Sequence, residues 1–288
     1  MLTRRGMIGG LAACVGVAGG IRSAAAMSTG AGEPFPERTA GSEAATARMP
    51  AALPYRRVTV PGAQAWSEYR RIAAAGDGCP VIVGDDAALE LVAATYGLGD
   101  RSEMPPGQGF LDPPSPADLL AAAEALRAPE RYLGWEGGYA PDEQVAPDGE
   151  WPPPSELEEV SILGPTVATD LLTGRPFPQV HILVLPAQAS WEVPAWLRWG
   201  GWNACPPPQY HVAALRSWHE RYGAELIGIN GDTMNLRAER PPRTRSEAMA
   251  LARELYRFCP DVVDQGVGTL SRLAAGLLAS EWWYLWWD

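Results

Sequence analysis

A small set of cysteine, histidine and aspartate side chains has the residue types that chemistry needs. Cys205 precedes His211 by six residues, and Cys259 and Asp261 open the later segment CPDVVDQGVG. Zinc is bound in proteins by thiolates, imidazoles and carboxylates, so these four side chains would form a zinc site if the fold brought them together. No recognised ligand spacing supports such a site. His219 adds no ligand pair with His211, because it lies roughly 80° around the helix from it and not one turn away. We therefore expect separate buried thiols, with a zinc site or a Cys205–Cys259 disulfide as the alternatives.

Carboxylates in the same part of the chain raise the hypothesis of a hydrolase. Asp261 and Asp264 lie in a glycine-flanked loop between two predicted helices, and loops of this kind often hold functional residues. With His211 as a base, these carboxylates would form a hydrolytic site, metal-assisted or not. Cys205 and His211 form a second possible pair, although Pro206–Pro208 make this segment look structural. The chain has no Gly-x-Ser-x-Gly elbow, so we expect no catalytic residues and keep the hydrolase as the alternative.

The remaining acidic and histidine residues have simpler interpretations. His181 lies in an apolar strand and is expected to be a packed residue. Asp85 and Asp86 stand where a helix needs an N-cap, and Asp232 is a turn residue. No Gly-x-Gly-x-x-Gly loop follows a strand, so we expect no nucleotide cofactor, and no cofactor of another kind is indicated.

Tryptophan and arginine are concentrated in the segment WEVPAWLRWGGWN. Its Trp199, Trp202 and Arg198 are candidates for a binding surface, because tryptophan and arginine are enriched at interface anchors. The expectation that we place first is core packing of these rings beneath the last strand of the chain. An exposed ring would instead favour a peptide or sugar groove.

Charge and composition narrow the classes of partner. The 288-residue chain has a formal net charge of -11, and all 23 of its basic residues are arginines. General nucleic-acid binding depends on phosphate neutralisation by basic groups, so the acidic balance excludes a nucleic-acid partner from our expectations. The expected partner is an unidentified protein or small molecule.

The N-terminus is predicted to be an export signal. Arg4 and Arg5 stand before a mildly apolar run and the small residues Ala24–Ala26, which resembles a twin-arginine signal cleaved after Ala26. The run is too weakly apolar for a permanent anchor, so we expect no transmembrane span in the mature chain. The expected location is the periplasm or the medium. The alternative is a lipid anchor at Cys14, because Leu11–Cys14 resembles a lipobox.

The order of predicted elements divides the chain into the export signal (1–26) and four further regions. Residues 27–53 read as a flexible leader, 54–127 as a small α/β region, 128–156 as a Pro- and Gly-rich linker and 157–288 as a C-terminal domain. Strands are predicted at 55–60, 80–84, 180–186, 224–229 and 233–238, the last two as a hairpin around Asn230-Gly231. Helices are predicted at 64–76, 85–97, 115–129, 209–223, 244–259 and 269–280.

The chain ends in EWWYLWWD, which is apolar on both faces when it is drawn as a strand. We therefore expect a strand that is covered on both sides, as an interior strand of a sheet is. The predicted fold is mixed α/β (α+β), a small N-terminal α/β unit followed by a C-terminal α+β domain whose sheet includes this tryptophan-rich strand.

Two long segments carry a family resemblance. PAWLRWGGWNACPPPQYHVAALRSWHERYGAELIGINGDTMNL and RPPRTRSEAMALARELYRFCPDVVDQGVGTLSRLAAGLLASEWWYLWWD resemble the bacterial family catalogued as domain of unknown function 4253. The resemblance is close over 185–288 and loose over 54–127. It implies a fold module and no activity. The sequence thus predicts an exported, non-catalytic binding or interaction module of the cell envelope, with a hydrolase near Cys205, His211 and Asp261 as the alternative.

Overall fold

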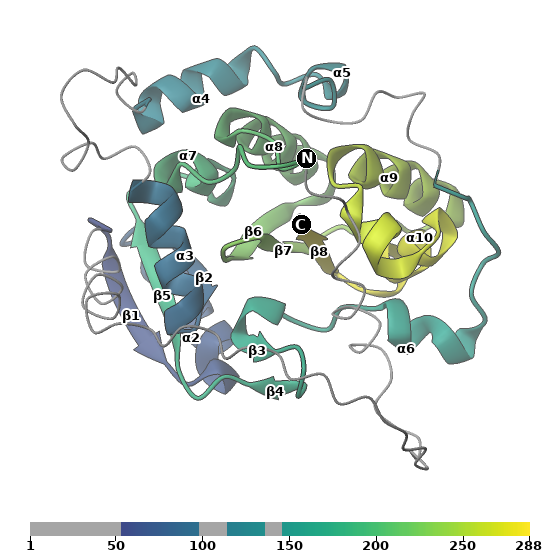
Figure 1. The fold of residues 1–288 in the computed structure, drawn as a ribbon, viewed down its shortest axis with the longest axis horizontal. Helices are drawn as coiled ribbons and strands as arrows, with labels where there is room; N and C mark the ends of the chain where they lie inside the picture. Colours follow the sequence, from purple (N-terminus) through teal and green to yellow (C-terminus); the bar gives the residue numbers. More distant parts are fainter. Residues whose placement is uncertain (1–52, 98–113, 136–145) are drawn as a thin grey trace, which may run out of the picture.

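The protein folds around a six-stranded mixed sheet with helices on both faces, as the computed structural model shows for residues 53–97, 114–135 and 146–288 (Figure 1). This confirms the predicted α+β class. The strands are β1 (Arg56–Val60), β2 (Cys79–Gly84), β5 (Val180–Leu185), β6 (Ala224–Ile229), β7 (Thr233–Ala238) and β8 (Trp282–Trp286), with β3 (Thr169–Asp170) and β4 (Arg175–Pro176) forming a separate hairpin. The α-helices are α2 (Ala65–Ala75), α3 (Asp86–Gly97), α4 (Pro116–Glu124), α5 (Pro129–Tyr132), α6 (Leu157–Val160), α7 (Val193–Leu197), α8 (Pro208–Tyr222), α9 (Arg245–Phe258) and α10 (Leu270–Ala279).

The strand order is β1-β5-β2-β6-β7-β8. β5 lies between β1 and β2 and is antiparallel to both, whereas β2 and β6 run parallel at the centre of the sheet. The strands of the predicted N-terminal region and those of the predicted C-terminal domain therefore share one sheet. The boundaries between these regions stay a prediction.

Alternation along the strands builds two hydrophobic layers. In β2, Val81 and Val83 join the larger cluster with α3, α7, α8 and α9, while Ile82 joins the smaller cluster beneath α2. A strand directs successive side chains to opposite faces, and both faces here are buried. This is why the strand reads as a continuous apolar run.

Local capping signals in the sequence are realised in the structure. Ser115 and Thr244 each form a capping box with an acidic residue three positions later, at the starts of α4 and α9. Asp85 accepts a hydrogen bond from the Ala88 N–H and so caps α3. The Asn230-Gly231 pair joins β6 to β7 as an antiparallel hairpin, which confirms that prediction.

Part of the segment predicted as a linker packs against the helices, while its residues 136–145 lie outside the described chain. α5 contacts α8, and the fully buried ring of Tyr132 ends in a hydroxyl that donates to Glu254 Oε1 over 2.6 Å. Trp218 Nε1 and Arg221 donate to the same carboxylate. One carboxylate thus joins α5, α8 and α9.

The predicted export signal, the lipobox at Cys14 and the leader up to residue 52 also lie outside the described residues. Among the helices that the structure describes, none is long and apolar enough to cross a membrane.

The tryptophan-rich strand β8 is buried as predicted, but the prediction of an interior position is wrong. β8 pairs with β7 alone and ends the sheet, apart from a single bridge between Ile162 and Trp282. Both its faces are nevertheless covered: Trp282 packs on Trp66 of α2, and Trp283 joins the larger cluster. An apolar pattern on two faces reports burial by helices and cannot distinguish a central strand from a covered edge.

Trp287 follows β8 and is expected to be a major source of stability. Its ring is 1% exposed and lies between Trp199, His211 and Phe258. Replacing a buried tryptophan by alanine costs about 3–5 kcal/mol, so Trp287→Ala should lower the free energy of unfolding by this amount in urea titrations. Leu172→Ala is the control, because Leu172 is 77% exposed and its loss should cost less than about 0.5 kcal/mol. A similar small cost for Trp287→Ala would contradict this role.

Candidate functional site

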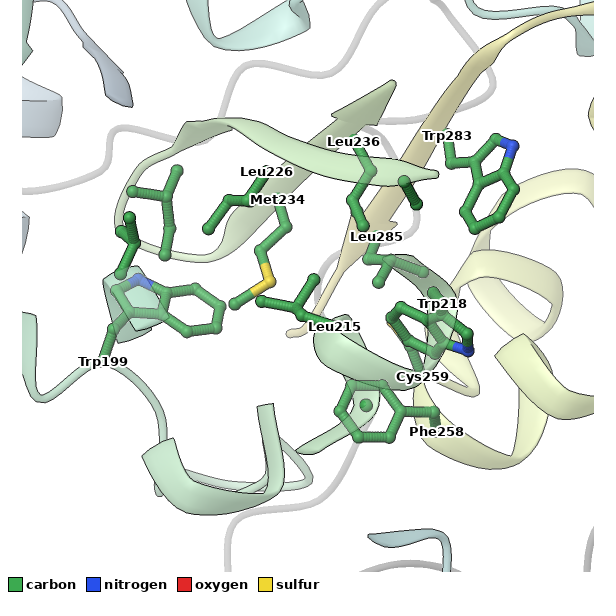
Figure 2. Packing of buried hydrophobic residues seen from close by; sticks show 14 of the residues in the cluster. Trp199, Leu215, Trp218, Leu226, Met234, Leu236, Phe258, Cys259, Trp283 and Leu285 are labelled. Atoms are coloured by element: carbon green, nitrogen blue, oxygen red, sulfur yellow. The ribbon is translucent and has the colours of Figure 1, made fainter. Parts of the chain in front are cut away.

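The structure brings Cys205 and His211 into contact inside the larger hydrophobic cluster. Cys205 Sγ lies 3.4 Å from His211 Nε2, and both residues are fully buried. Aromatic rings surround the imidazole, with centroids at 4.9 Å for Trp199, 5.2 Å for Trp287 and 5.3 Å for Phe258. Figure 2 shows part of this larger cluster, with the ring of Phe258 below that of Trp218 in the view. The two residues that the sequence analysis named as a possible pair are therefore in contact, in an apolar environment.

This environment keeps both groups neutral. Burial lowers the pKa of His211 from 6.5 to about 3, and the Pro206 carbonyl opposes this shift only in part. Burial also raises the pKa of the Cys205 thiol well above its ordinary value, and the neighbouring Cys259 adds to the increase. A nucleophilic cysteine needs the opposite, a thiolate beside an imidazolium. The pair as it stands is suited to packing.

The other predicted ligands and carboxylates are engaged elsewhere. Cys259 donates its S–H to the Trp286 carbonyl over 2.9 Å, and the structure has it as a free thiol, as it has Cys205. Asp261 accepts from the Asp288 N–H and from Gln265, and Asp264 accepts from the Tyr256 hydroxyl. No group of three or more histidine, cysteine or acidic side chains with an arrangement for a metal ion occurs in the described residues.

Of the candidate binding residues, Trp199 lies inside this cluster, and Trp202 and Arg198 lie at its edge. Trp199 is fully buried, and its indole N–H donates to the Asn230 carbonyl over 2.6 Å. Trp202 is half-buried with its ring 4.7 Å from that of Trp199, and Arg198 covers the ring of Tyr96 at 4.8 Å. Trp199 is therefore a core residue, while Trp202 and Arg198 reach partly to the surface.

A pocket that the sequence interpretation missed lies where the parallel strands β2 and β6 end. Its volume is about 160 Å³. Ligands in α/β sheets commonly bind beyond the carboxyl ends of parallel strands, where the chain turns away. The polar side chains that line this pocket are Asp85, Thr166, Thr169, Asp170, Asn230 and Thr233.

Close backbone packing creates the first wall of the pocket. Gly84 ends β2 with a φ of +113°, and a Cβ there would come within 2.9 Å of the Val167 carbonyl oxygen. Asn235, fully buried on β7, holds the same segment by accepting from the Val167 N–H and by hydrogen bonding with Thr166. The 3₁₀ turn Thr166–Ala168 is thereby fixed against the sheet.

The turn between β6 and β7 forms the opposite wall. Asn230 Oδ1 accepts from the backbone N–H groups of Asp232 and Thr233, and the Thr233 hydroxyl donates to Asp232. Trp199 Nε1 bonds to the Asn230 carbonyl from the core side, and the Trp287 N–H bonds to the Asp232 carbonyl. The hydrophobic cluster thus fixes one wall of the pocket.

His181 lies beside the pocket and is a packed residue, as its position in an apolar strand suggested. Its Nε2 is 2.7 Å from Asp86 Oδ1, and its Nδ1 is 3.1 Å from the hydroxyl of Thr59. The order of carboxylate, imidazole and hydroxyl resembles a catalytic triad. Thr59, however, is exposed on the outermost strand β1 and is absent from the described lining of the pocket. The network joins β1, β5 and the start of α3.

The sequence contained two local signals for the pocket. Asp85 and Asp86 follow the buried strand β2 directly, and Asn230 and Asp232 follow β6. Each was explained as a cap or a turn residue, which is structurally correct. The missing fact was the parallel pairing of β2 with β6, which brings both strand ends to one place.

Comparison with known proteins finds a family model that matches the second part of the chain. Residues 181–288 match the model of a family described as Domain of unknown function (DUF4253). The chain matches no curated protein and no solved structure. The matched segment begins within β5 and contains Asn230 and Thr233, whereas Asp85 and Asp170 lie outside it.

Burial of neutral His211 makes stability depend on pH. The unfolded chain binds a proton at His211 below pH 6.5, while the folded protein does so only near pH 3, so stability falls as the pH drops through this window. We expect about 2 kcal/mol of this loss between pH 7.5 and pH 5. Urea unfolding of His211→Leu at both pH values should show a loss in the free energy of unfolding that is smaller by that amount than the loss in the unaltered protein.

Leu172→Ala is again the control, because it alters an exposed apolar side chain and removes no titratable group. It should leave the difference between the two pH values close to that of the unaltered protein. An unchanged pH dependence in His211→Leu would show that His211 is not held neutral.

Proposed function

We propose that this protein is a non-catalytic binding module whose ligand enters the pocket at the ends of β2 and β6. The family match over residues 181–288 names no activity. The observation that supports this proposal most is the convergence of polar side chains from separate elements on one cavity. Asp85 comes from the start of α3, Thr169 and Asp170 from β3, and Asn230 from the turn after β6. Small-molecule sites have this form, a concave surface with a few placed polar groups.

The contacts within the walls favour a preformed site. Asn235 holds the segment Thr166–Ala168, and Trp199 holds the Asn230 carbonyl, so the lining groups keep their positions without a ligand. Preorganisation lowers the entropy cost of binding. The polar walls are therefore suited to recognising a ligand by defined hydrogen bonds.

The hydrolase alternative stays a hypothesis with weaker support. It needs an ionised or activatable group near His211, whereas burial raises the pKa of Cys205, and Asp261 bonds to Gln265 and the Asp288 N–H. The geometry around His211 favours packing over chemistry.

The binding function can be tested by mapping ligand contacts. A small-molecule library added to ¹⁵N-labelled protein should perturb the amide signals of Asp85, Thr169, Asp170, Asn230 and Thr233 together. Thr169→Val replaces the hydroxyl by a methyl group of similar size and should weaken binding several-fold, because a hydrogen bond to the ligand is lost. Thr95→Val, on the opposite end of α3, is the matched control and should change nothing. Perturbations confined to the region of Trp202, or none at all, would reject the pocket as the site.

We also propose that the protein acts outside the cytoplasm, in the periplasm or the medium. The support is the pair Arg4 and Arg5 before an apolar run and the small residues ending at Ala26. Replacing both arginines by lysine should retain the protein in the cytoplasmic fraction, and the exported chain should begin at Met27 on N-terminal sequencing. Lipid labelling that is lost in Cys14→Ala would instead establish the anchored form.

A further inference from the structure

We propose that the pocket at the ends of β2 and β6 recognises an ammonium or guanidinium group carried on a short apolar chain. This inference rests on the proposed binding function and specifies its ligand class. The same chemistry is presented by a free alkylamine and by the basic side chain of a peptide, and the experiment below separates these two sources.

The charge of the pocket is the first argument. Two carboxylates, Asp85 and Asp170, line it, and the described lining contains no arginine or histidine. Two further aspartates are next to lining residues in the sequence, Asp86 after Asp85 and Asp232 before Thr233. The Leu172 N–H, together with the hydroxyl and the N–H of Thr173, donates to Asp170 and lowers the pKa of that carboxyl, so it stays ionised at neutral pH. The lining of the pocket is therefore net negative, and Arg175, the cross-strand partner of Asp170, is not part of it.

The N-terminus of α3 does not reverse this charge. A helix N-terminus carries the equivalent of about half a positive charge and often binds anions. Here Asp85 already accepts the Ala88 N–H at 3.0 Å, and Asp86 is the first residue of the helix. Asp86 bonds to His181 and does not line the pocket, so Asp85 supplies the charge here. Its full negative charge outweighs the half charge of the helix dipole, and a phosphate or carboxylate ligand would meet repulsion.

The hydrogen-bonding groups also favour a ligand that donates. Asp85 and Asp170 each use one oxygen, Oδ1, in the hydrogen bonds to backbone N–H groups described above. Ionised carboxylates accept only, and each oxygen has two lone pairs. An ammonium group brings three donors and a guanidinium group five, which matches these acceptors.

Size and the apolar part of the lining define the rest of the ligand. The volume of about 160 Å³ is close to that of an engineered protein cavity of about 150 Å³ that holds a benzene molecule, so a group of a few heavy atoms fits the pocket. Val167, Leu171 and Phe177 line the same space. A short methylene chain would contact these side chains while its charged end meets the carboxylates.

The test compares three ligands with the same chain and different charge. Pentylamine, 1-pentanol and pentanoate are titrated into ¹⁵N-labelled protein and followed at the pocket amides. Pentylamine should bind at least tenfold more tightly than the other two, because a charge-assisted hydrogen bond is worth about a factor of ten or more. Equal or tighter binding of 1-pentanol or pentanoate at the pocket would overturn the cation assignment and leave the binding function intact.

Matched variants assign the effect to the two carboxylates. Asp85→Asn keeps a good N-cap, and Asp170→Asn keeps an oxygen for the Leu172 N–H, so both should fold while losing one charge. Each should weaken pentylamine binding about tenfold, whereas Asp77→Asn, which removes an exposed charge in the loop after α2, should not. Melting curves of every variant verify folding.

Unchanged pentylamine affinity in both folded pocket variants would overturn the inference. The absence of pocket perturbations with all three ligands would also overturn it, and the broader library then decides separately whether the binding function survives. Nα-acetyl-lysine methylamide and a lysine-containing pentapeptide are titrated in parallel. Tighter binding of the pentapeptide than of pentylamine identifies a peptide side chain as the source, and the reverse identifies a free amine.

Discussion

The turn from Asn230 to Thr233 is the constraint on which both the core and the pocket depend. From the core, Trp199 Nε1 bonds to the Asn230 carbonyl, and the Trp287 N–H bonds to the Asp232 carbonyl. From the other side, Asn230 and Thr233 line the pocket. The aromatic residues around His211 therefore do more than fill space, because they hold one wall of a polar site in position. A substitution that loosens the packing of the aromatic cluster should also shift the residues that line the pocket, since packed interiors transmit strain.

The elements could be predicted from the sequence far better than the site. The helical spacing in 209–223, the capping box at Thr244 and the Asn230-Gly231 turn are local signals, and the structure has each of them in place. The pocket is not local: it requires β2 to lie beside β6, which is far away in the chain. The hydrophobic periodicity of a strand does not indicate which strand lies beside it, so the sequence alone indicates only a helix cap at Asp85 and Asp86 and a turn residue at Asp232. The same limit explains β8, whose apolar faces indicated burial but not its place at the edge of the sheet.

Residue type alone was a poor guide to chemistry at His211. Cysteine, histidine and aspartate together suggested zinc or a nucleophile, yet the ionisation that either requires is opposed by the surroundings. The rings of Trp199, Trp287 and Phe258 exclude solvent from the imidazole, and its pKa falls as a result. The family match covers this aromatic core but not Asp85 or Asp170. In our interpretation, the matched segment supplies the scaffold, and the preceding part of the chain supplies the acidic recognition groups.

The position of β5 between β1 and β2 has a consequence for how the chain reaches this structure. β1 and β2 do not pair with each other, so neither gains a partner strand until β5 has been made. Ribosomes add roughly 5–20 residues per second, and the interval from Gly84 to Val180 therefore lasts several seconds. During that time the apolar run Val81–Val83 has no sheet to join, and unpaired apolar strands are prone to aggregate. The early part of the chain should accordingly be a preferred substrate for chaperones during synthesis.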